Sequence, residues 1–492
     1  MIHLEPVILK KQRRLIITWS ITFLVLFPLL IFLGFLMRIG QGEMKKLLLA
    51  NFYSLMTLHG IGMMSVLFSF AFAILWYLIS TRFARLNIWV GYFVYFTILI
   101  AVAGLTIGIL IGKFDTGWNM LYPLPFRGAT WLSWSTGVSI ISLVILGIAW
   151  LVGILHLLYS LSKEFGGFTN LLGWQYLRKK EVKKELSPIV LVTTVSLIPV
   201  LLAFLDGAIM LIMYLLQFIE PRLKFDPLLL ENITLFFGNT FVNTTLFCGV
   251  GWVYALLPEF TDREWKTDKV LVYFWNATFL LIVFAYFQNL YMDFVEPVAI
   301  QYTGQVVNYL SAVPATIITM FGVIVQFYHS KIKWNIIPLM FLFGIAGWAI
   351  GGFAATVEST MAIHKILHNT MWLPAHLHTT MLMGLTLFIF AFLFYFFSDK
   401  GKQYGDKVAK LGLWLFVIGG YGFVLTFYIE GIDSIPRRYA RYTGIGIKSM
   451  HDTAVHQAQI AVFFVVILLV GLFIMYYSLF RKLLKKKVKP NF

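Results

Sequence analysis

Long apolar segments, each able to cross a lipid bilayer, follow one another along almost the whole chain. A bilayer-spanning helix needs about 20 apolar residues. Of the 492 residues, 60% are hydrophobic and only 12% are charged, whereas soluble domains carry about 25% charged residues. These figures exclude both a soluble globular protein and a disordered chain. The sequence therefore predicts an all-α, polytopic membrane protein with about twelve transmembrane helices.

Charged residues, prolines and glycines mark the ends of these segments. The expected helices cover residues 15–37, 52–79, 88–112, 129–161, 188–218, 231–257, 270–292, 305–328, 335–357, 371–397, 411–429 and 455–480. We expect one transmembrane domain over residues 1–492, with cytoplasmic tails at about 1–14 and 481–492. The first segment follows a basic stretch and has no small-residue cleavage site after it, so it is expected to be a retained span.

The basic residues are distributed unevenly between the two ends of these spans. With the N-terminus inside, the inner segments carry 27 of the 39 Lys and Arg residues. Cytoplasmic loops of membrane proteins carry such an excess, so both termini are expected in the cytoplasm. The net charge of +17 then reflects topology and not nucleic-acid binding. The single cysteine, Cys248, excludes a disulfide framework and a c-type haem attachment motif.

Three histidines lie inside expected spans, where a polar side chain is costly and needs a partner. His59 is in the second span, and His376 and His378 are in the tenth. Residues two apart on an α-helix are separated by about 200°, so His376 and His378 cannot bind the same metal. Imidazole is a common axial ligand of haem iron, and this spacing favours two haems flanking one helix, with His59 completing one site. The alternative is three unrelated core histidines bonded to neighbouring hydroxyl groups.

Two adjacent arginines, Arg437 and Arg438, lie in an expected outer loop. A guanidinium group binds a carboxylate through two parallel hydrogen bonds, so haem propionates at the outer face would be suitable partners. A solvated basic loop is the alternative, but loops on this side of a membrane usually lack positive charge.

Together these residues resemble subunit I of the haem-copper oxidase superfamily, in the B-type form of archaea and thermophilic bacteria. The resemblance covers nearly the whole chain and includes the motifs Thr57-Leu58-His59-Gly60, Thr116-Gly117-Trp118, Tyr122-Pro123, His368-Asn369-Thr370, His376-x-His378 and Pro436-Arg437-Arg438-Tyr439. It implies two haems, with His59 and His378 as axial ligands of a low-spin haem and His376 as the one protein ligand of a high-spin haem.

The resemblance also implies roles for residues near the outer face. Arg437 and Arg438 would hold haem propionates, and His368 would lie near a propionate of the high-spin haem. A second membrane subunit that carries or receives electrons is expected, as is a prokaryotic cytoplasmic membrane location. The haem types are not readable from the sequence.

The sequence departs from this family at the second metal. The family binds copper, or a non-haem iron in nitric oxide reductases, with one histidine in a Gly-His-Pro-x-Val-Tyr motif and a His-His pair. Here Asn239 replaces the first histidine, Asn243 replaces the tyrosine, and Gln288 and Asn289 stand where the pair should be. Amides are poor copper ligands but form hydrogen bonds. We therefore expect no copper or non-haem iron, and a pocket that holds water or orients a small ligand.

Three functions fit these patterns. In the first, the chain is an oxidoreductase subunit that passes electrons from a low-spin to a high-spin haem, which reacts with O2 or NO. Haem chemistry like that of nitric oxide dismutases is one version. In the second, it is a non-catalytic two-haem electron relay or gas-binding subunit of a larger complex. In the third, it is a transporter with buried histidines, which explains neither the His-x-His pair nor the two arginines.

Overall fold

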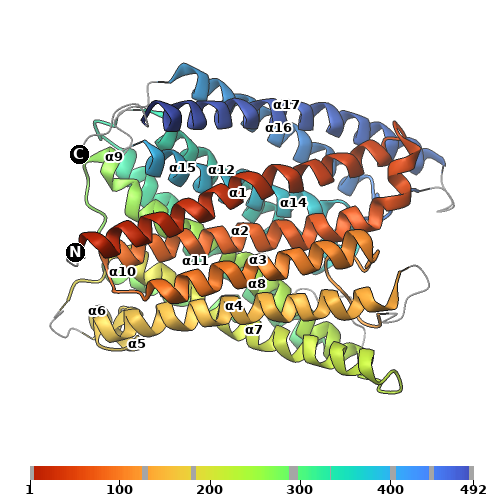
Figure 1. Ribbon diagram of the computed structural model, residues 1–492, viewed down its shortest axis with the longest axis horizontal. Helices are drawn as coiled ribbons and strands as arrows, with labels where there is room; N and C mark the ends of the chain where they lie inside the picture. Colours follow the sequence, from red (N-terminus) through yellow and green to blue (C-terminus); the bar gives the residue numbers. More distant parts are fainter. Residues whose placement is uncertain are drawn as a thin grey trace. The chain divides into compact units, whose positions relative to one another are not determined.

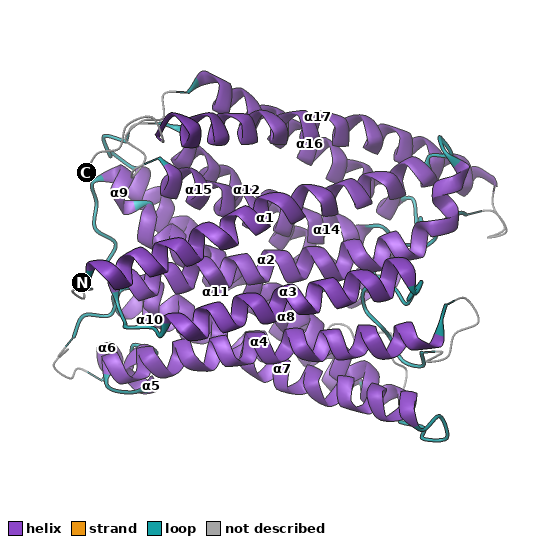
Figure 2. Cartoon of the chain, in the orientation of Figure 1, coloured by secondary structure: helices purple, strands orange, loops and turns teal. Residues whose placement is uncertain are grey.

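All regular secondary structure in the described part of the chain is helical (Figure 1 and Figure 2). The structure is a computed structural model that describes residues 5–124, 131–178, 184–287, 297–332, 334–398, 406–442 and 448–486. Twelve of its helices are long and apolar enough to cross a membrane. The predicted all-α, polytopic membrane fold is confirmed.

The twelve spans follow the predicted segments in order. They are α1 (Pro6–Gln41), α2 (Phe52–Arg82), α3 (Ile88–Thr106), α4 (Ser133–Phe165), α7 (Pro188–Ile219), α8 (Pro227–Leu256), α10 (Lys269–Phe284), α11 (Val298–Phe327), α12 (Ile336–Glu358), α14 (Trp372–Thr380) continued by α15 (Thr386–Phe397), α16 (Lys407–Ile432) and α17 (Lys448–Lys486). The short helices α5 (Phe168–Leu171), α6 (Trp174–Leu177), α9 (Pro258–Thr261) and α13 (Met361–Leu367) lie between spans. Several spans extend beyond the predicted ends, because helices continue past the apolar stretch into polar residues.

The chain divides into two compact units. The first consists of Met1–Gly34, Ala50–Gly251 and Lys266–Ile318, and the second of Phe35–Leu49, Trp252–Trp265 and Thr319–Phe492. His59, Asn239 and Asn243 belong to the first unit, and the other described candidate residues belong to the second. A single haem-binding domain over the whole chain remains a prediction.

In the second unit, three glycines allow α12 to pack very closely against the span formed by α14 and α15. Gly344, Gly347 and Gly351 are spaced as neighbours on one helix face. A Cβ atom on Gly347 would lie 2.3 Å from the carbonyl oxygen of Met383, and one on Gly351 would lie 2.2 Å from Thr380 Oγ1. Small residues permit such close approach between membrane helices, and here they bring α12 against the helix that carries two of the candidate haem ligands.

Candidate functional site

His376 and His378 both lie on α14, which begins at Trp372. The Nδ1 atom of His378 lies 2.7 Å from the carbonyl oxygen of Pro374, one turn earlier. A carbonyl can only accept a hydrogen bond, so Nδ1 must carry the proton and Nε2 is left as the ligand atom. The ring of His378 also contacts Phe423 and Phe427 of α16, with 5.5 and 5.4 Å between ring centroids. The helix itself thus orients this imidazole for binding through Nε2.

His59 is held in the same way in the first unit. Its Nδ1 atom lies 2.7 Å from the carbonyl oxygen of Leu30 in α1, which again leaves Nε2 as the ligand atom. Gly34 lies so close that a Cβ atom there would be 2.9 Å from the His59 ring. The imidazole is therefore fixed both by a hydrogen bond and by the neighbouring backbone.

The first unit also brings two of the predicted motifs together around His59. The backbone N–H of Gly117 donates to Thr57 Oγ1 at 2.9 Å. A Cβ atom on Gly60 would lie 2.4 Å from the Cβ atom of Trp118. The Thr116-Gly117-Trp118 motif therefore packs directly on the turn of α2 that carries His59.

His376 stands two residues before His378, and the backbone of α12 lies next to it. A Cβ atom on Gly351 would be 3.3 Å from the carbonyl oxygen of His376. Glu358, at the end of α12, interacts electrostatically with His376. The helix continues through a π-helical turn at Met381–Leu385 before α15 begins, and such turns are frequent at functional sites.

Two loops of the second unit that carry predicted motifs are joined by backbone hydrogen bonds. Arg437 N–H donates to Asn369 O at 3.0 Å, and Met371 N–H donates to Ile435 O at 2.9 Å. Thr370 and Pro436 form an isolated antiparallel bridge between these bonds. The His368-Asn369-Thr370 and Pro436-Arg437-Arg438 motifs therefore meet just before α14 begins.

The guanidinium groups of this loop are well placed to bind anions. Burial and the neighbouring Arg438 lower the pKa of Arg437 to about 9, and burial lowers the pKa of Arg438. Among the described residues, Arg437 Nε and Arg438 Nη2 are buried and have no hydrogen-bond partner. Burying a charge without a partner is costly. Carboxylates such as haem propionates would satisfy both atoms, so these residues fit a haem.

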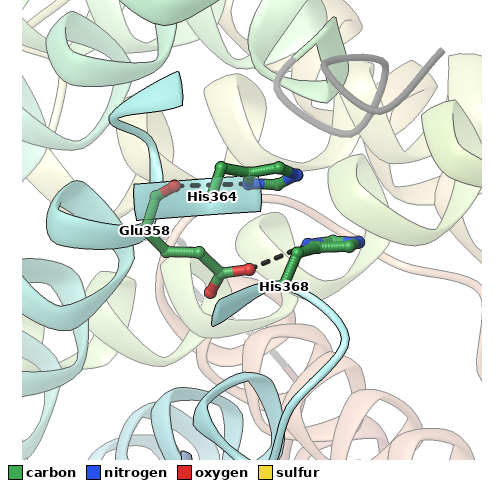
Figure 3. A group of neighbouring side chains, drawn as sticks. All are labelled: Glu358, His364 and His368. Atoms are coloured by element: carbon green, nitrogen blue, oxygen red, sulfur yellow. Dashed lines mark hydrogen bonds and ion pairs between the residues drawn. The ribbon is translucent and has the colours of Figure 1, made fainter. Parts of the chain in front are cut away.

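Glu358 joins His364 and His368 in a compact group that the sequence analysis did not predict (Figure 3). His368 Nδ1 lies 2.9 Å from Glu358 Oε1, and His364 Nδ1 lies 3.2 Å from the backbone oxygen of Glu358. The two imidazole rings are stacked, with 4.2 Å between their centroids. One signal was available in the sequence, because Glu358 is an acidic residue at the end of an otherwise apolar span.

Both imidazoles of this group are neutral at physiological pH. Burial and the nearby His368 lower the pKa of His364 to about 4. Burial, Arg437 and Arg438 lower the pKa of His368 to about 3. The group therefore offers two neutral imidazoles and one carboxyl group.

The residues predicted to replace the second-metal ligands are only partly within the described chain. Asn239 and Asn243 lie one turn apart on α8, and Asn243 Nδ2 donates to the backbone oxygen of Asn239 at 2.8 Å and to its Oδ1 at 3.3 Å. Gln288 and Asn289 lie outside the described residues. The structure thus brings two of the four amides together.

A buried ion pair beside His378 was also not predicted. Arg38 Nη2 lies 2.5 Å from Glu430 Oε1, and the two side chains are 4% and 1% exposed. The Arg38 guanidinium stacks over the Phe427 ring at 4.7 Å, and this ring contacts His378. The charges are 392 residues apart in the sequence, so no local pattern could reveal them.

These features define a class of polytopic membrane protein with oriented imidazoles inside its spans. A loop bonded to the segment before α14 adds two buried guanidinium nitrogens that have no hydrogen-bond partner among the described residues. The chain matches the family model described as cytochrome c and quinol oxidase polypeptide I over residues 14–474. It therefore belongs to this family, subunit I of the haem-copper respiratory terminal oxidases, whose members bind haem.

Known relatives agree with this assignment. The chain is 27% identical to cytochrome c oxidase subunit 1 of Pecten maximus over 338 aligned residues. This alignment covers 66% of this chain and 67% of the relative. It is 26% identical over 258 residues to cytochrome c oxidase subunit 1 of Cereibacter sphaeroides, covering 51% of this chain and 44% of the relative. With cytochrome c oxidase polypeptide 1 of Halobacterium salinarum, the match is 25% identical over 219 residues and covers 44% of this chain and 36% of the relative. The chain thus matches less than half of the length of the last two relatives.

The fold is also that of a solved structure described as a heme-copper terminal oxidase dimer. The TM-score is 0.77 and the sequence identity is 19%, over 97% of this chain and 84% of that chain.

Proposed function

We propose that this chain is the haem-bearing subunit of a membrane respiratory oxidoreductase, with His59 and His378 as ligands of a low-spin haem and His376 as the ligand of a high-spin haem. When bound, these haems would supply electron transfer and an iron that reacts with O2 or NO. The observation that carries the proposal is that two buried guanidinium atoms, Arg437 Nε and Arg438 Nη2, have no hydrogen-bond partner within the described part of the chain. They lie in a loop bonded to the segment that leads into the His-x-His helix.

The roles of the protein side chains follow from their contacts. The carbonyl groups of Leu30 and Pro374 fix the tautomers of His59 and His378, so that each presents Nε2. Arg437 and Arg438 would neutralise propionates, and His368, 3.5 Å from Arg437 Nη2, would lie beside them. The charges of the arginines are then balanced without exposing the site to water.

We also propose that no copper or non-haem iron occupies the second-metal position. Asn239 and Asn243 supply amides there, which are weak ligands for these metals. Asn243 donates to Asn239, whereas Asn239 Nδ2 is buried and has no hydrogen-bond partner among the described residues. This free donor supports a role in binding water or a small ligand. Conventional four-electron reduction of O2 with proton pumping is disfavoured, because Asn243 replaces the tyrosine.

Electrons would enter through a further membrane subunit or from a quinol. The chain has one cysteine and no c-type haem attachment motif, so it lacks the ligands for a donor centre of its own. The basic N- and C-terminal segments favour a cytoplasmic location of both termini. The resemblance to the B-type oxidases of archaea and thermophilic bacteria favours a prokaryotic inner membrane.

Optical spectra of the purified full chain, with and without CO, test the proposal. Two haems, of which one responds to CO, are the expected result. Two haems that both ignore CO would favour the second candidate, a non-catalytic electron-relay subunit. A protein that binds no haem would contradict both. Metal analysis tests the second part, since stoichiometric copper lost on replacement of Asn239 would show that the site is not vacated.

A further inference from the structure

Basic side chains from α1, from the end of α2 and from the turn before α3 lie at one end of the first unit, the end predicted to be cytoplasmic. They are Lys10, Lys11, Arg13, Arg14, Arg82 and Arg85. In the sequence of residues 5–14 and 77–92, the only acidic residue is Glu5. An excess of positive charge is enough to orient the spans, but orientation does not require that charges from separate helices meet. Their convergence therefore indicates a second role.

The backbone that carries these cations is held in place by buried polar contacts. Gln12 of α1 donates from Nε2 to the backbone oxygen of Leu86 at 3.2 Å, and its Oε1 accepts a hydrogen bond from Trp76 Nε1 at 3.1 Å. The backbone N–H of Asn87, which precedes α3, donates to His156 Nε2 of α4 at 3.0 Å. These bonds join α1, α2, α4 and the turn before α3, so the basic residues are presented from a fixed frame.

Three of the cations meet two aromatic side chains at this corner. Arg13 of α1 and Arg82 of α2 both interact electrostatically with the hydroxyl group of Tyr77, so guanidinium groups from two helices lie near one position. Lys11 Nζ lies over the ring of Trp89, 6.0 Å from its centroid, and Trp89 is 70% exposed. Tryptophan is typical of the membrane–water interface, and Arg and Lys are the side chains that bind phosphate. The corner thus places phosphate-binding groups at the depth of lipid headgroups.

An exposed apolar stripe on α3 begins at Trp89. Phe93, Phe96 and Ile100 follow at spacings of four, three and four residues, which places all four side chains on one helix face. All of them are exposed. Such a stripe on a membrane span suits the acyl chains of a lipid, which are as apolar as the side chains themselves. The contact between Lys11 and Trp89 makes the basic corner and the apolar stripe continuous.

We propose that Lys11, Arg13, Arg82 and Trp89 bind the headgroup of one anionic phospholipid, whose acyl chains lie along the α3 stripe. A negatively charged lipid is favoured over a zwitterionic one, because the positive group of a zwitterionic headgroup would lie among the cations. The cytoplasmic leaflet carries the anionic lipids, and the distribution of basic residues places this end of the unit at that leaflet. The proposal does not depend on the haem assignment.

Native mass spectrometry of the delipidated full chain, titrated with phosphatidylglycerol or with phosphatidylcholine of the same acyl chains, tests this site. We expect one phosphatidylglycerol to bind more tightly than any phosphatidylcholine. A basic residue near the membrane surface strengthens the binding of anionic lipid by about fivefold, so Arg13→Gln combined with Arg82→Gln should weaken it by roughly 30-fold. Lys163→Gln combined with Lys184→Gln is the matched control. It removes the same charge from the same unit, and Lys184 is already paired with Glu164 at 2.6 Å, so it should bind the lipid as the unmutated protein does.

Two further measurements separate the loss of charge from the loss of folding. Arg13→Lys combined with Arg82→Lys keeps both charges and should retain the preference for phosphatidylglycerol. Photoreactive phosphatidylglycerol should label the unmutated protein at the start of α1 and in the turn before α3. Equal binding of the two lipids, equal binding by the Gln variant and its control, or equal loss in the Lys and Gln variants would each overturn the proposal. Labelling of other segments alone, the result expected if a second copy or another subunit covers this face, would overturn it as well.

Discussion

At the scale of single residues, the backbone decides which nitrogen of each haem-ligand candidate is available. Leu30 and Pro374 contribute only carbonyl oxygens, yet each one fixes a histidine tautomer. Side-chain substitutions at these two positions would leave the acceptor in place. Substitution of the histidines themselves is therefore the direct way to test the proposed haem binding.

Replacing His376 with alanine should abolish the response to CO and leave the low-spin spectrum unchanged. His376 is the only candidate ligand assigned to the high-spin haem, whereas His378 is oriented by its own bond to Pro374. Difference spectra of the reduced protein with and without CO provide the measurement. The control is His456→Ala, a substitution on α17. This variant should respond to CO as the unmutated protein does. A CO response that survives in His376→Ala would contradict the assignment.

Replacing Glu430 with glutamine should destabilise the second unit strongly. Arg38 and Glu430 are almost completely buried, and removal of one partner of a buried ion pair costs about 3–5 kcal/mol because the other charge is left uncompensated. Thermal unfolding in detergent and retention of the low-spin haem would report the loss. Glu43→Gln is the control, because its 3.7 Å pair with His451 is partly exposed and such pairs contribute about 0–1 kcal/mol. Equal stability of the two variants would show that the buried pair contributes little.

At the scale of helices, the spans were predictable, but the irregular turn within one span and the short helix between two others were not. Apolar runs bounded by charges place the spans, because the bilayer demands continuous apolar helices. The π-helical turn at Met381–Leu385 and the short helix α13 depend on tertiary packing, which leaves no periodic signal.

The same limit applies to the candidate site. The His-x-His spacing and the adjacent arginines are local patterns, so the sequence reveals them. Glu358 and His364 are six residues apart and are brought together only because α12 ends and the chain turns before α13. Arg38 and Glu430 come from opposite ends of the sequence. Contacts of this kind depend on how the helices pack, so they cannot be predicted from local patterns in a single sequence.

Two glycines on α12 permit a matched test of helix packing. A Cβ atom on Gly347 would lie 2.3 Å from the backbone oxygen of Met383, and backbone cannot rotate away. Gly347→Ala should therefore push α12 from the His376 helix, at an overpacking cost of about 1–3 kcal/mol, and reduce high-spin haem content. A Cβ atom on Gly352 would meet no described atom within 4 Å, so Gly352→Ala should be neutral or slightly stabilising. Haem content and melting temperature of the two variants, measured under the same conditions, test this difference. Equal values for both variants would contradict the packing argument.

At the scale of the whole molecule, the distribution of positive charge predicts orientation in the membrane. Lys184 precedes α7 and Arg222 follows it, so a spanning α7 must place them on opposite sides. The side chains are 45% and 95% exposed. The native Cys248 is fully buried, and buried thiols are inert, so single cysteines can be introduced without removing it.

Lys184→Cys should react with a membrane-impermeant maleimide only from the cytoplasmic side, and Arg222→Cys only from the outside. The physical reason is the excess of Lys and Arg in the segments assigned to the cytoplasm, which sets the direction of insertion. Labelling of intact cells, compared with inverted membrane vesicles, measures this directly, and the unmodified chain provides the unlabelled background. The reversed pattern would overturn the predicted orientation, while labelling of both positions from one side would show that α7 does not span the membrane.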